Sequence, residues 1–501
     1  MATENHFDVL IVGAGISGID AAYHVKQHFP DKTFAMLETQ AGFGGTWRTH
    51  KYPGIRSDSD LFTFGYKWKP WMGAPIATAD EILKYLREVL EEQELESHIN
   101  FGQKVVRADW SSEAGTWLLE VEDVESKERH PLTCNFLWMC QGYYHHAEGY
   151  TPEWPSMDDF AGQIVHPQTW PEDLDYKDKK VVVIGSGATA ATVVPAMAGE
   201  CEHITLLQRS PTYFAPGLNK NELADTLREL DVPDEWTHEI VRRKILHDQQ
   251  EITRRSFEEP EGLKQELLDG ARAYLGDDFD IEKHFTPKYR PWQQRLAFIP
   301  DGDLFQGIAS GQASVVTDTI NRFTNKGILL DSGQELEADI VVTATGFDLC
   351  VMGGIQFTVD GADVDFSEHV GYRGFMFNNV PNMAWVFGYF RASWTLRADL
   401  ISEFLCRVFN YMNDNDFDVV TPQLRAEDQD MTLTPWVDPD NFNPGYLTRS
   451  LHLMPKQGDR APWVFTQDYW QEKEEFPIAD LEDGALVFSQ TSGEQQTSAS
   501  G

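Results

Sequence analysis

The chain has 501 residues, which at roughly 150 residues per domain predicts about three domains and excludes a single small module. Lys and Arg total 41 while Asp and Glu total 80, so the formal net charge is −39 at pH 7. A surface this acidic repels phosphate backbones and anionic lipid, so we expect no nucleic-acid partner and no membrane insertion. A hydrophobic fraction of 41% is enough to form large cores and excludes a wholly disordered chain.

The five cysteines bear on metal binding and on location. Their number is odd and no two form a C-x-x-C pair, which argues against both a disulfide framework and a thiolate metal site. We therefore predict no metal ligands and a reducing, cytoplasmic location. The N-terminal segment has no basic region ahead of its apolar run, which argues against a secretory signal.

The first pattern in chain order is a buried strand, a glycine turn and a helix. Phe7 to Val12 is a continuous apolar run, and a helical pattern follows the turn GAGISG. In such a turn Gly13 permits the tight bend, Gly15 lets the backbone approach a pyrophosphate, and Gly18 allows the helix to pack close to the strand. Glu38 ends the next apolar strand about 20 residues further on, where a carboxylate can accept both ribose hydroxyls. This unit predicts a dinucleotide site.

The following segments extend the same unit. The pattern predicts an amphipathic helix over Ala79 to Glu94, a strand pair over Val105 to Trp110 and Trp117 to Val121, and a return strand over Leu137 to Cys140.

A second unit repeats the first about 170 residues later. An apolar strand leads into the turn GSGATA, in which Gly185, Gly187 and Ala190 occupy the three fingerprint positions. The next strand ends in Arg209 and Ser210 and not in an acid. A carboxylate there would repel a 2′-phosphate, whereas a guanidinium binds it, so these two residues favour NADPH over NADH. The alternative for Arg209 is an ordinary surface charge.

Two such units in one chain predict an α/β fold with two Rossmann-like dinucleotide-binding domains, one for FAD and one for NADP. A charged, helix-patterned stretch predicts a helical insertion in the NADP domain, through NELADTLREL, THEIVRRKILHDQQEITRRSF and EGLKQELLDGARAYL. The expected divisions are the FAD domain, first part, over 1–147; the NADP domain, first part, over 148–213; the helical insertion over 214–306; the NADP domain, second part, over 307–348; and the FAD domain, second part, over 349–501, with a disordered tail SQTSGEQQTSASG.

A flavin and a nicotinamide in one chain imply hydride exchange between them. A disulfide reductase would add a redox dithiol, but Cys134 and Cys140 are six apart on a predicted strand, and no closer pair exists in the sequence. Dithiol chemistry is therefore disfavoured.

The segment between the two glycine turns reads FAGQIVHPQTWP and matches the pattern F-x-G-x-x-x-H-x-x-x-W-P at every fixed position: Phe160, Gly162, His166, Trp170 and Pro171. This pattern resembles the fingerprint of type I Baeyer-Villiger monooxygenases and of the related flavin-containing monooxygenases.

Three further segments agree with this resemblance. They are GGTW with Gly45, Thr46 and Trp47, then YPGIRSD with Asp58, and ATGFD with Gly346. Within the family, HPQTWPEDLDY, LQRSPTY and ASWTL are most similar to the mycobacterial ethionamide-activating members.

The resemblance implies a reaction and a set of partners. NADPH would reduce FAD, the reduced flavin would trap O₂ as a C4a-peroxyflavin, and one oxygen atom would enter a ketone to give an ester or lactone, with sulfides as further substrates. The partners are then O₂ and a small ketone or thioether. Arg295 corresponds to the family's cation that keeps the peroxide deprotonated, and Arg290 is a weaker choice. Asp58 corresponds to the carboxylate that positions this arginine, and a structural ion pair is the alternative.

Four more residues receive expected roles. His166 is interpreted as a linker residue that couples domain rotation to the position of NADP, with Trp170 and Pro171 stiffening the connection, and a structural histidine is the alternative. Trp394 is expected over the nicotinamide or substrate side of the pocket, and core packing is the alternative.

Three other functions remain open at this point. A sulfide or amine oxygenase would use the same flavin intermediate, an NADPH oxidase would release peroxide, and a redox sensor would bind the nucleotides without catalysis. Tight coupling of NADPH use to an oxygenated product separates an oxygenase from an NADPH oxidase.

Overall fold

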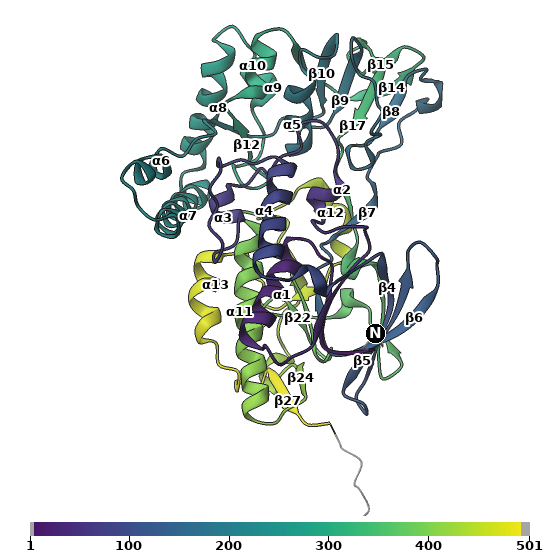
Figure 1. The fold of residues 1–501 in the computed structure, drawn as a ribbon. Helices are drawn as coiled ribbons and strands as arrows, with labels where there is room; N and C mark the ends of the chain where they lie inside the picture. The colour runs from purple at the N-terminus through teal and green to yellow at the C-terminus, as the bar shows by residue number, and fades with distance from the viewer. Residues whose placement is uncertain (1–4, 492–501) are drawn as a thin grey trace, which may run out of the picture.

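The computed structural model describes residues 5–491 and arranges them in two lobes (Figure 1). The lower lobe joins the beginning of the chain to its end, and the middle of the chain forms the upper lobe. Each lobe contains a sheet, of nine strands in the lower lobe and of five in the upper. The expected α/β class is confirmed.

The nine-stranded sheet has the order β20-β19-β4-β5-β6-β1-β2-β3, with β23 also paired to β6. Strand β1 runs parallel to both β2 and β6, so the carboxyl ends of these three strands meet at one edge. Ligands of open parallel sheets bind at that edge. The strands are β1 (His6–Val12), β2 (Phe34–Glu38), β3 (Ile99–Phe101), β4 (Gln103–Ser111), β5 (Thr116–Asp123), β6 (Arg129–Met139), β19 (Gln356–Val359), β20 (Ala362–Asp363) and β23 (Met383–Trp385).

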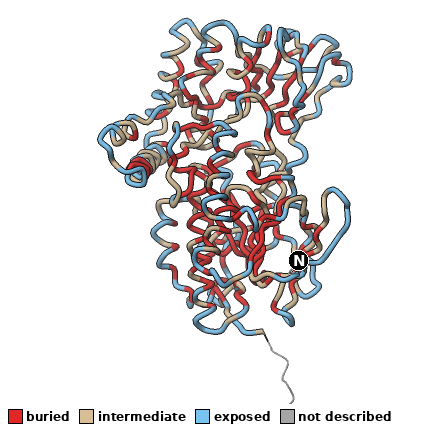
Figure 2. Tube along the Cα trace, in the orientation of Figure 1, coloured by how far each residue is buried: buried red, intermediate tan, exposed pale blue. Residues whose placement is uncertain are grey.

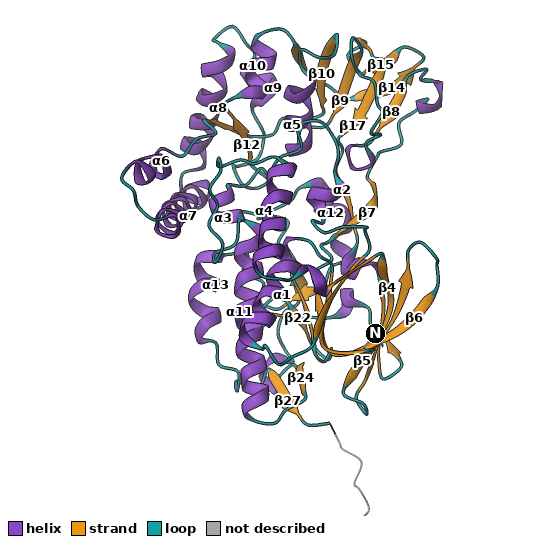
Figure 3. Cartoon of the chain, in the orientation of Figure 1, coloured by secondary structure: helices purple, strands orange, loops and turns teal. Residues whose placement is uncertain are grey.

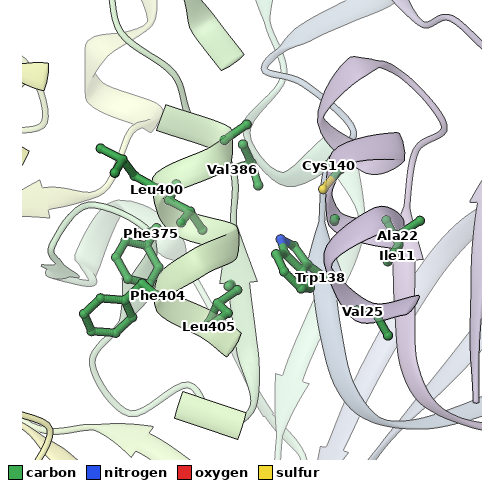
Figure 4. Close-up of a cluster of buried hydrophobic side chains, with 14 of the residues drawn as sticks. Ile11, Ala22, Val25, Trp138, Cys140, Phe375, Val386, Leu400, Phe404 and Leu405 are labelled. Atoms are coloured by element: carbon green, nitrogen blue, oxygen red, sulfur yellow. The ribbon is translucent and has the colours of Figure 1, made fainter. Parts of the chain in front are cut away.

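Two helices cover one face of this sheet, α1 (Ile16–His28) and α11 (Trp394–Asp414). Figure 4 shows their shared core: Ala22 and Val25 of α1 lie on one side of Trp138 from β6, and Leu405 of α11 lies on the other. Because the two helices come from opposite ends of the chain, the lower lobe closes only when the last third of the chain returns to the first.

The upper sheet has the order β13-β10-β9-β17-β8, and all its strands are parallel. Helix α5 (Ala188–Met197) follows the second glycine turn. Buried β-branched residues fill β9 and β17, as expected for strands covered on both faces. The strands are β8 (Gln163–Val165), β9 (Lys180–Ile184), β10 (His203–Gln208), β13 (Ala313–Thr317) and β17 (Ile340–Thr343).

The segment expected as a helical insertion contains its three predicted helices, α6 (Glu222–Glu229), α7 (Asp234–Glu258) and α8 (Pro260–Leu275), followed by a short α9 (Ile281–Phe285). Helices α6 and α7 project from the side of the molecule (Figure 3). The segment is not purely helical, however. Strands β11 (Phe214–Gly217) and β12 (Ala297–Pro300) pair in parallel within it, and the expected limit at 306 falls inside α10 (Asp303–Ala309).

The two lobes are joined by an antiparallel pair, β7 (Tyr144–Gly149) and β18 (Phe347–Leu349). The expected limits at 147 and 348 therefore fall inside connecting strands and not between elements, and the domain division as a whole stays a prediction. Figure 2 shows that the buried segments run through the middle of each lobe.

The remaining elements are short or peripheral. The helices are α2 (Thr46–Thr49), α3 (Leu61–Phe64), α4 (Ala79–Glu92), α12 (Gly445–Ser450) and α13 (Tyr469–Glu475). The strands are β14 (Ile320–Thr324), β15 (Gly327–Leu330), β16 (Glu335–Glu337), β21 (Gly371–Tyr372), β22 (Met376–Phe377), β24 (Val419–Pro422), β25 (Thr434–Pro435), β26 (Lys456–Gln457) and β27 (Leu486–Ser489).

The start of the predicted disordered tail is ordered. Ser489 ends β27, which pairs with β24, and the Thr491 hydroxyl donates to Asp418 at 2.8 Å. The rest of the predicted tail lies outside the described residues. Within residues 5–491, no helix combines the length and the apolar character that crossing a membrane requires.

Candidate active site

A single cavity of about 1350 Å³ receives both glycine turns. It lies where the carboxyl ends of β1 and β2 in the lower sheet face those of β9 and β10 in the upper sheet. Many of the expected site residues line it: Gly13, Gly15, Glu38, Gly45, Thr46, Trp47, Asp58, Gly185, Gly187, Arg209, Ser210, Arg295, Gly346 and Trp394. The structure therefore brings the expected FAD, NADP and catalytic residues together in one space.

The first turn is built by close backbone contacts. A Cβ on Gly18 would lie 1.9 Å from the Gly13 carbonyl oxygen, and a Cβ on Gly13 would lie 2.7 Å from the Cys140 oxygen. Gly13 also has a φ of +102°, in the region that favours glycine. At Gly15 a Cβ would have no neighbour nearer than 3.6 Å, to Gly45, so the open side of the turn is a cradle that a dinucleotide fits.

Glu38 faces this cradle from the end of β2. Its side chain is buried, with Oε2 accepting a hydrogen bond from the Ala14 amide at 2.9 Å and Oε1 accepting one from the Gln40 amide at 2.8 Å. These bonds fix the carboxylate, and each oxygen keeps a second lone pair for a hydroxyl donor. Such a carboxylate suits a ribose.

The GGTW segment closes the same cradle. The Gly44 amide donates to the Ala14 carbonyl at 2.9 Å, and Gly45, with a φ of +54°, precedes the short helix α2. Thr46 and Trp47 open this helix, and both line the cavity. The segment thus places a helix N-terminus opposite the first glycine turn.

The second turn is more open. A Cβ on Gly185 would lie 2.2 Å from the Ala344 oxygen, but a Cβ on Gly187 would have no neighbour within 4 Å. Ala190 already carries a Cβ and is fully buried. Arg209 and Ser210 are exposed at the end of β10 and line the cavity. A cation and a hydroxyl are thereby available for a phosphate.

Arg295 and Asp58 form a bidentate ion pair between the two turns. Arg295 Nε donates to Asp58 Oδ2 at 2.6 Å and Nη2 donates to Oδ1 at 2.7 Å. Nη2 also donates to Ser59 Oγ at 3.2 Å, and Nη1 donates to the Phe390 carbonyl at 3.1 Å. Four of the five N–H groups thus reach acceptors among residues 5–491, and one N–H of Nη1 has none there.

The protonation states of this pair are fixed by their contact. Burial alone would raise the pKa of Asp58, but the charge and hydrogen bonds of Arg295 outweigh it and hold the pKa below its ordinary value. Burial lowers the pKa of Arg295, and Asp58 more than compensates, so the net pKa is raised. At neutral pH the cavity therefore holds a carboxylate and a guanidinium.

Aromatic side chains complete the wall around this pair. Tyr143 stacks on Trp394 with a centroid distance of 5.3 Å and an interplanar angle of 11°, and Tyr446 lines the cavity from α12. Burial raises the pKa of Tyr446 to about 12, so its hydroxyl stays protonated. We did not expect these tyrosines from the sequence. The position of Tyr143 shortly after the carboxyl end of β6 is the signal that would have found it.

Trp394 begins α11 and donates through Nε1 to Ser17 Oγ at 2.8 Å. It lines the cavity and also packs against Tyr143. Its expected place over the nicotinamide or substrate side of the pocket stays a prediction.

The fingerprint residues do not line the cavity. A Cβ on Gly162 would lie 2.2 Å from the Asp339 oxygen, so this position requires glycine for the pairing of β8 with β17. His166 lies against β7, because a Cβ on Gly149 would lie 1.9 Å from its ring. Its Nδ1 accepts from the Gln168 amide at 3.1 Å, and burial lowers its pKa. Its Nε2 is buried and has no hydrogen-bond partner in the described part of the chain.

The other fingerprint residues pack at the sheet. Phe160 contacts Phe323 in the core next to β14, Trp170 belongs to the core of the upper lobe with Tyr52, and Pro171 is exposed. The fingerprint therefore builds the junction between the lobes and the edge of the upper sheet. Arg290, the weaker alternative to Arg295, also lies outside the cavity lining and donates to the Asn441 carbonyl at 3.0 Å.

Comparison with known proteins places this architecture in the class of flavin-dependent monooxygenases. Residues 75–221 match the model of the flavin-binding monooxygenase-like family, and residues 11–69 match that of an NAD(P)-binding Rossmann-like domain. The chain belongs to the family of FAD-containing monooxygenases related to EthA. The EthA of Mycolicibacterium smegmatis is 46% identical over 97% of this chain and 97% of its own length.

A further relative supports this placement, and a solved structure shares the fold. A probable FAD-binding monooxygenase, AlmA of an Acinetobacter species, is 43% identical over 98% of both chains. Among solved structures, an oxidised steroid monooxygenase bound to NADP has a TM-score of 0.75 at 20% identity, covering 97% of this chain and 100% of that chain. The expected recognition of the family and the flavoprotein monooxygenase class are confirmed.

Proposed function

We propose that this protein is an NADPH-consuming, FAD-dependent monooxygenase that inserts one oxygen atom of O₂ into ketones to give esters or lactones. FAD fits the first glycine turn with Glu38, and NADPH fits the second with Arg209 and Ser210. Bound FAD, once reduced by NADPH, supplies the chemistry that activates O₂ for transfer to the substrate. Relatives and neighbours support this assignment by their names, including a cyclohexanone monooxygenase with bound ε-caprolactone.

The observation that carries the proposal is the Arg295–Asp58 pair inside the shared cavity. Asp58 holds the guanidinium plane through two hydrogen bonds, and the remaining Nη1 N–H stays available to a reacting oxygen. A fixed cation stabilises negative charge on that oxygen and favours its attack on a carbonyl carbon. The same cavity offers the protonated Tyr446 hydroxyl as a donor to a substrate oxygen.

Two supporting roles complete the proposal. Trp394 and Tyr143 form an apolar wall that keeps water from the reacting atoms. His166, held on β7 at the junction of the lobes, couples rotation of the upper lobe to the position of the nicotinamide.

The test compares Arg295→Ala with Arg290→Ala, an arginine outside the cavity. Each purified FAD-loaded enzyme is given NADPH, ¹⁸O₂ and cyclic, linear or aryl ketones or a thioether, and products are measured by mass spectrometry. We expect Arg295→Ala to reduce flavin normally but to lose ester formation by about 10²- to 10³-fold, the cost of losing one charge-stabilising donor. Arg290→Ala should keep its product.

Full ester formation by Arg295→Ala contradicts the proposal. Labelled sulfoxide without any labelled ester in the native enzyme identifies a sulfide oxygenase instead. Release of all electrons as hydrogen peroxide, with every substrate, identifies an NADPH oxidase.

A further inference from the structure

A group of polar side chains lies between α1 and α11, outside the cofactor cavity. The members on α1 recur every four residues and so share one face of that helix, and three side chains of α11 lie opposite them: Asp20, His24 and His28 on α1, and Asp399, Ser402 and Cys406 on α11. In the monooxygenase reaction proposed above, none of them has a role.

The hydrogen bonds of His24 leave one ring nitrogen free. Its Nε2 lies 3.2 Å from Asp399 Oδ1 and 3.7 Å from Asp20 Oδ1, so Nε2 carries a proton and donates it to a carboxylate. His24 is only 4% exposed, and its Nδ1 is buried with no hydrogen-bond partner among residues 5–491. A buried nitrogen without a partner is costly unless something binds it.

His24, His28 and Cys406 each offer one ligand atom, and these three atoms all lie within 4.8 Å of one another. Cys406 is buried, whereas His28 is exposed and stacks on His24 with a centroid distance of 5.8 Å. Two imidazoles and a thiolate are the donors that Zn²⁺ prefers. A carboxylate that holds the far nitrogen of a ligating histidine, as Asp399 holds that of His24, is the usual support of such a site.

We propose that His24, His28 and Cys406 bind one divalent cation of the borderline-soft class, represented by Zn²⁺, with water from the exposed side as a fourth ligand. Binding displaces the thiol proton of Cys406 and involves no redox change. The ion joins α1, which begins at the first glycine turn, to α11, which begins at Trp394. It therefore braces the two helices whose N-termini reach the cofactor cavity.

This proposal departs from the sequence-based prediction of no metal ligands. That prediction rested on the absence of closely spaced cysteines, but this group combines a single cysteine with histidines of a distant helix. His24 and Asp399, which face each other, are 375 positions apart. Only the packing of α1 on α11 brings them together.

The test uses the full-length, FAD-loaded enzyme after chelator treatment and removal of the chelator. It is titrated with zinc chloride, retained zinc is measured by elemental analysis after desalting, and Tm is recorded. We expect about one zinc per chain and a raised Tm. His28→Ala removes an exposed ligand without opening the core and should weaken zinc binding at least about 10-fold.

Two controls separate a built site from surface binding. His247→Ala removes a histidine of α7 that, like His28, lies on a helix and is exposed, with 77% of its side chain accessible. This variant should bind zinc as the native chain does. With Co²⁺ in place of Zn²⁺, the native chain should show d–d absorption of a tetrahedral site that Cys406→Ser alters. Failure of the native chain to retain zinc, or equal binding by native and His28→Ala enzymes, overturns the proposal.

Discussion

The two glycine turns of this protein follow the same local pattern but differ in how tightly they are built. In the lower lobe Gly18 packs against Gly13 with no room for a methyl group, and Glu38 is buried and held by two backbone amides. In the upper lobe Ala190 fills the corresponding position, and Arg209 is exposed at the cavity edge. The first site thus holds its carboxylate in a buried position, whereas the second presents an exposed arginine and a glycine, Gly187, with open space beside it.

This contrast matches what the two proposed nucleotides must do. A flavin that stays bound through many catalytic cycles needs a rigid, preformed binding site. A nicotinamide nucleotide that binds, reacts and moves in each cycle needs a site whose contacts form on binding and are readily released. A change in the first turn should therefore act on folding, and a change in the second should act on affinity.

The largest expected effect comes from Gly18→Ala. The new Cβ would lie 1.9 Å from a backbone oxygen, so helix α1 must shift. We expect the free energy of unfolding to fall by at least about 3 kcal/mol and FAD binding to be lost. Tm and flavin content of the purified chain measure this. The matched change Ala190→Gly in the second turn should cost only about 1 kcal/mol. A Gly18→Ala enzyme that retains FAD and has the native Tm would refute the contrast between the two turns.

The contact between α7 and the lower lobe allows a test by pH. The Trp71 amide donates to Nδ1 of His238, which is 2% exposed, and burial, followed by the charge of Arg242, lowers the pKa of His238 to about 4. Above pH 6.5 the histidine is neutral whether the chain is folded or unfolded. As the pH falls from 6.5 to 4, only the unfolded chain takes up the proton, so stability falls by about 3 kcal/mol.

Melting curves between pH 7 and pH 4 measure this effect. His238→Gln keeps an acceptor for the Trp71 amide but cannot ionise, so its Tm should fall less over that range than the native Tm. His247→Gln, on the exposed face of α7, should follow the native enzyme. Parallel curves for all three proteins would show that His238 is not the group responsible.

The smallest of these effects concerns the second site. Arg209→Ala removes a hydrogen bond to a charged group, worth about 1.5 to 3 kcal/mol, and should raise the Kd for NADPH about 10- to 100-fold. NADH, which lacks the 2′-phosphate, should bind equally to both proteins, and Tm should not change because Arg209 is exposed. An unchanged Kd for NADPH would leave Arg209 an ordinary surface charge.

Local features of this fold could be predicted well from the sequence. Each glycine turn is a strand, a bend and a helix within one continuous stretch, so the residue types and their spacing are sufficient to place it. The pairing of Arg295 with Asp58 joins residues 237 positions apart and came only from the resemblance to a family. No local pattern indicates such a contact.

Other features left no signal that sequence reasoning could use. Strand β11 reads Phe-Ala-Pro-Gly, whose last two residues usually break a strand, yet it pairs with β12 across four intervening helices. Its stability comes from packing in the upper core and not from propensity. The same holds for the facing side chains of α1 and α11, which only the closed lower lobe brings together.

The antiparallel pair of β7 and β18 has a consequence for how such a chain can change. Phe347 lies opposite Gly149 and Leu349 opposite Tyr144, so the polypeptide leaves the lower lobe and re-enters it at neighbouring points. The chain thus connects the two lobes covalently at two adjacent places, and the buried Arg242 of α7 and the Arg295–Asp58 pair add non-covalent contacts between them. Recombination at these two places would exchange the upper lobe for that of a paralogue and leave every strand of the nine-stranded sheet with its original neighbours. The incoming lobe would have to supply arginines at the positions of Arg295 and Arg242, which contact the lower lobe.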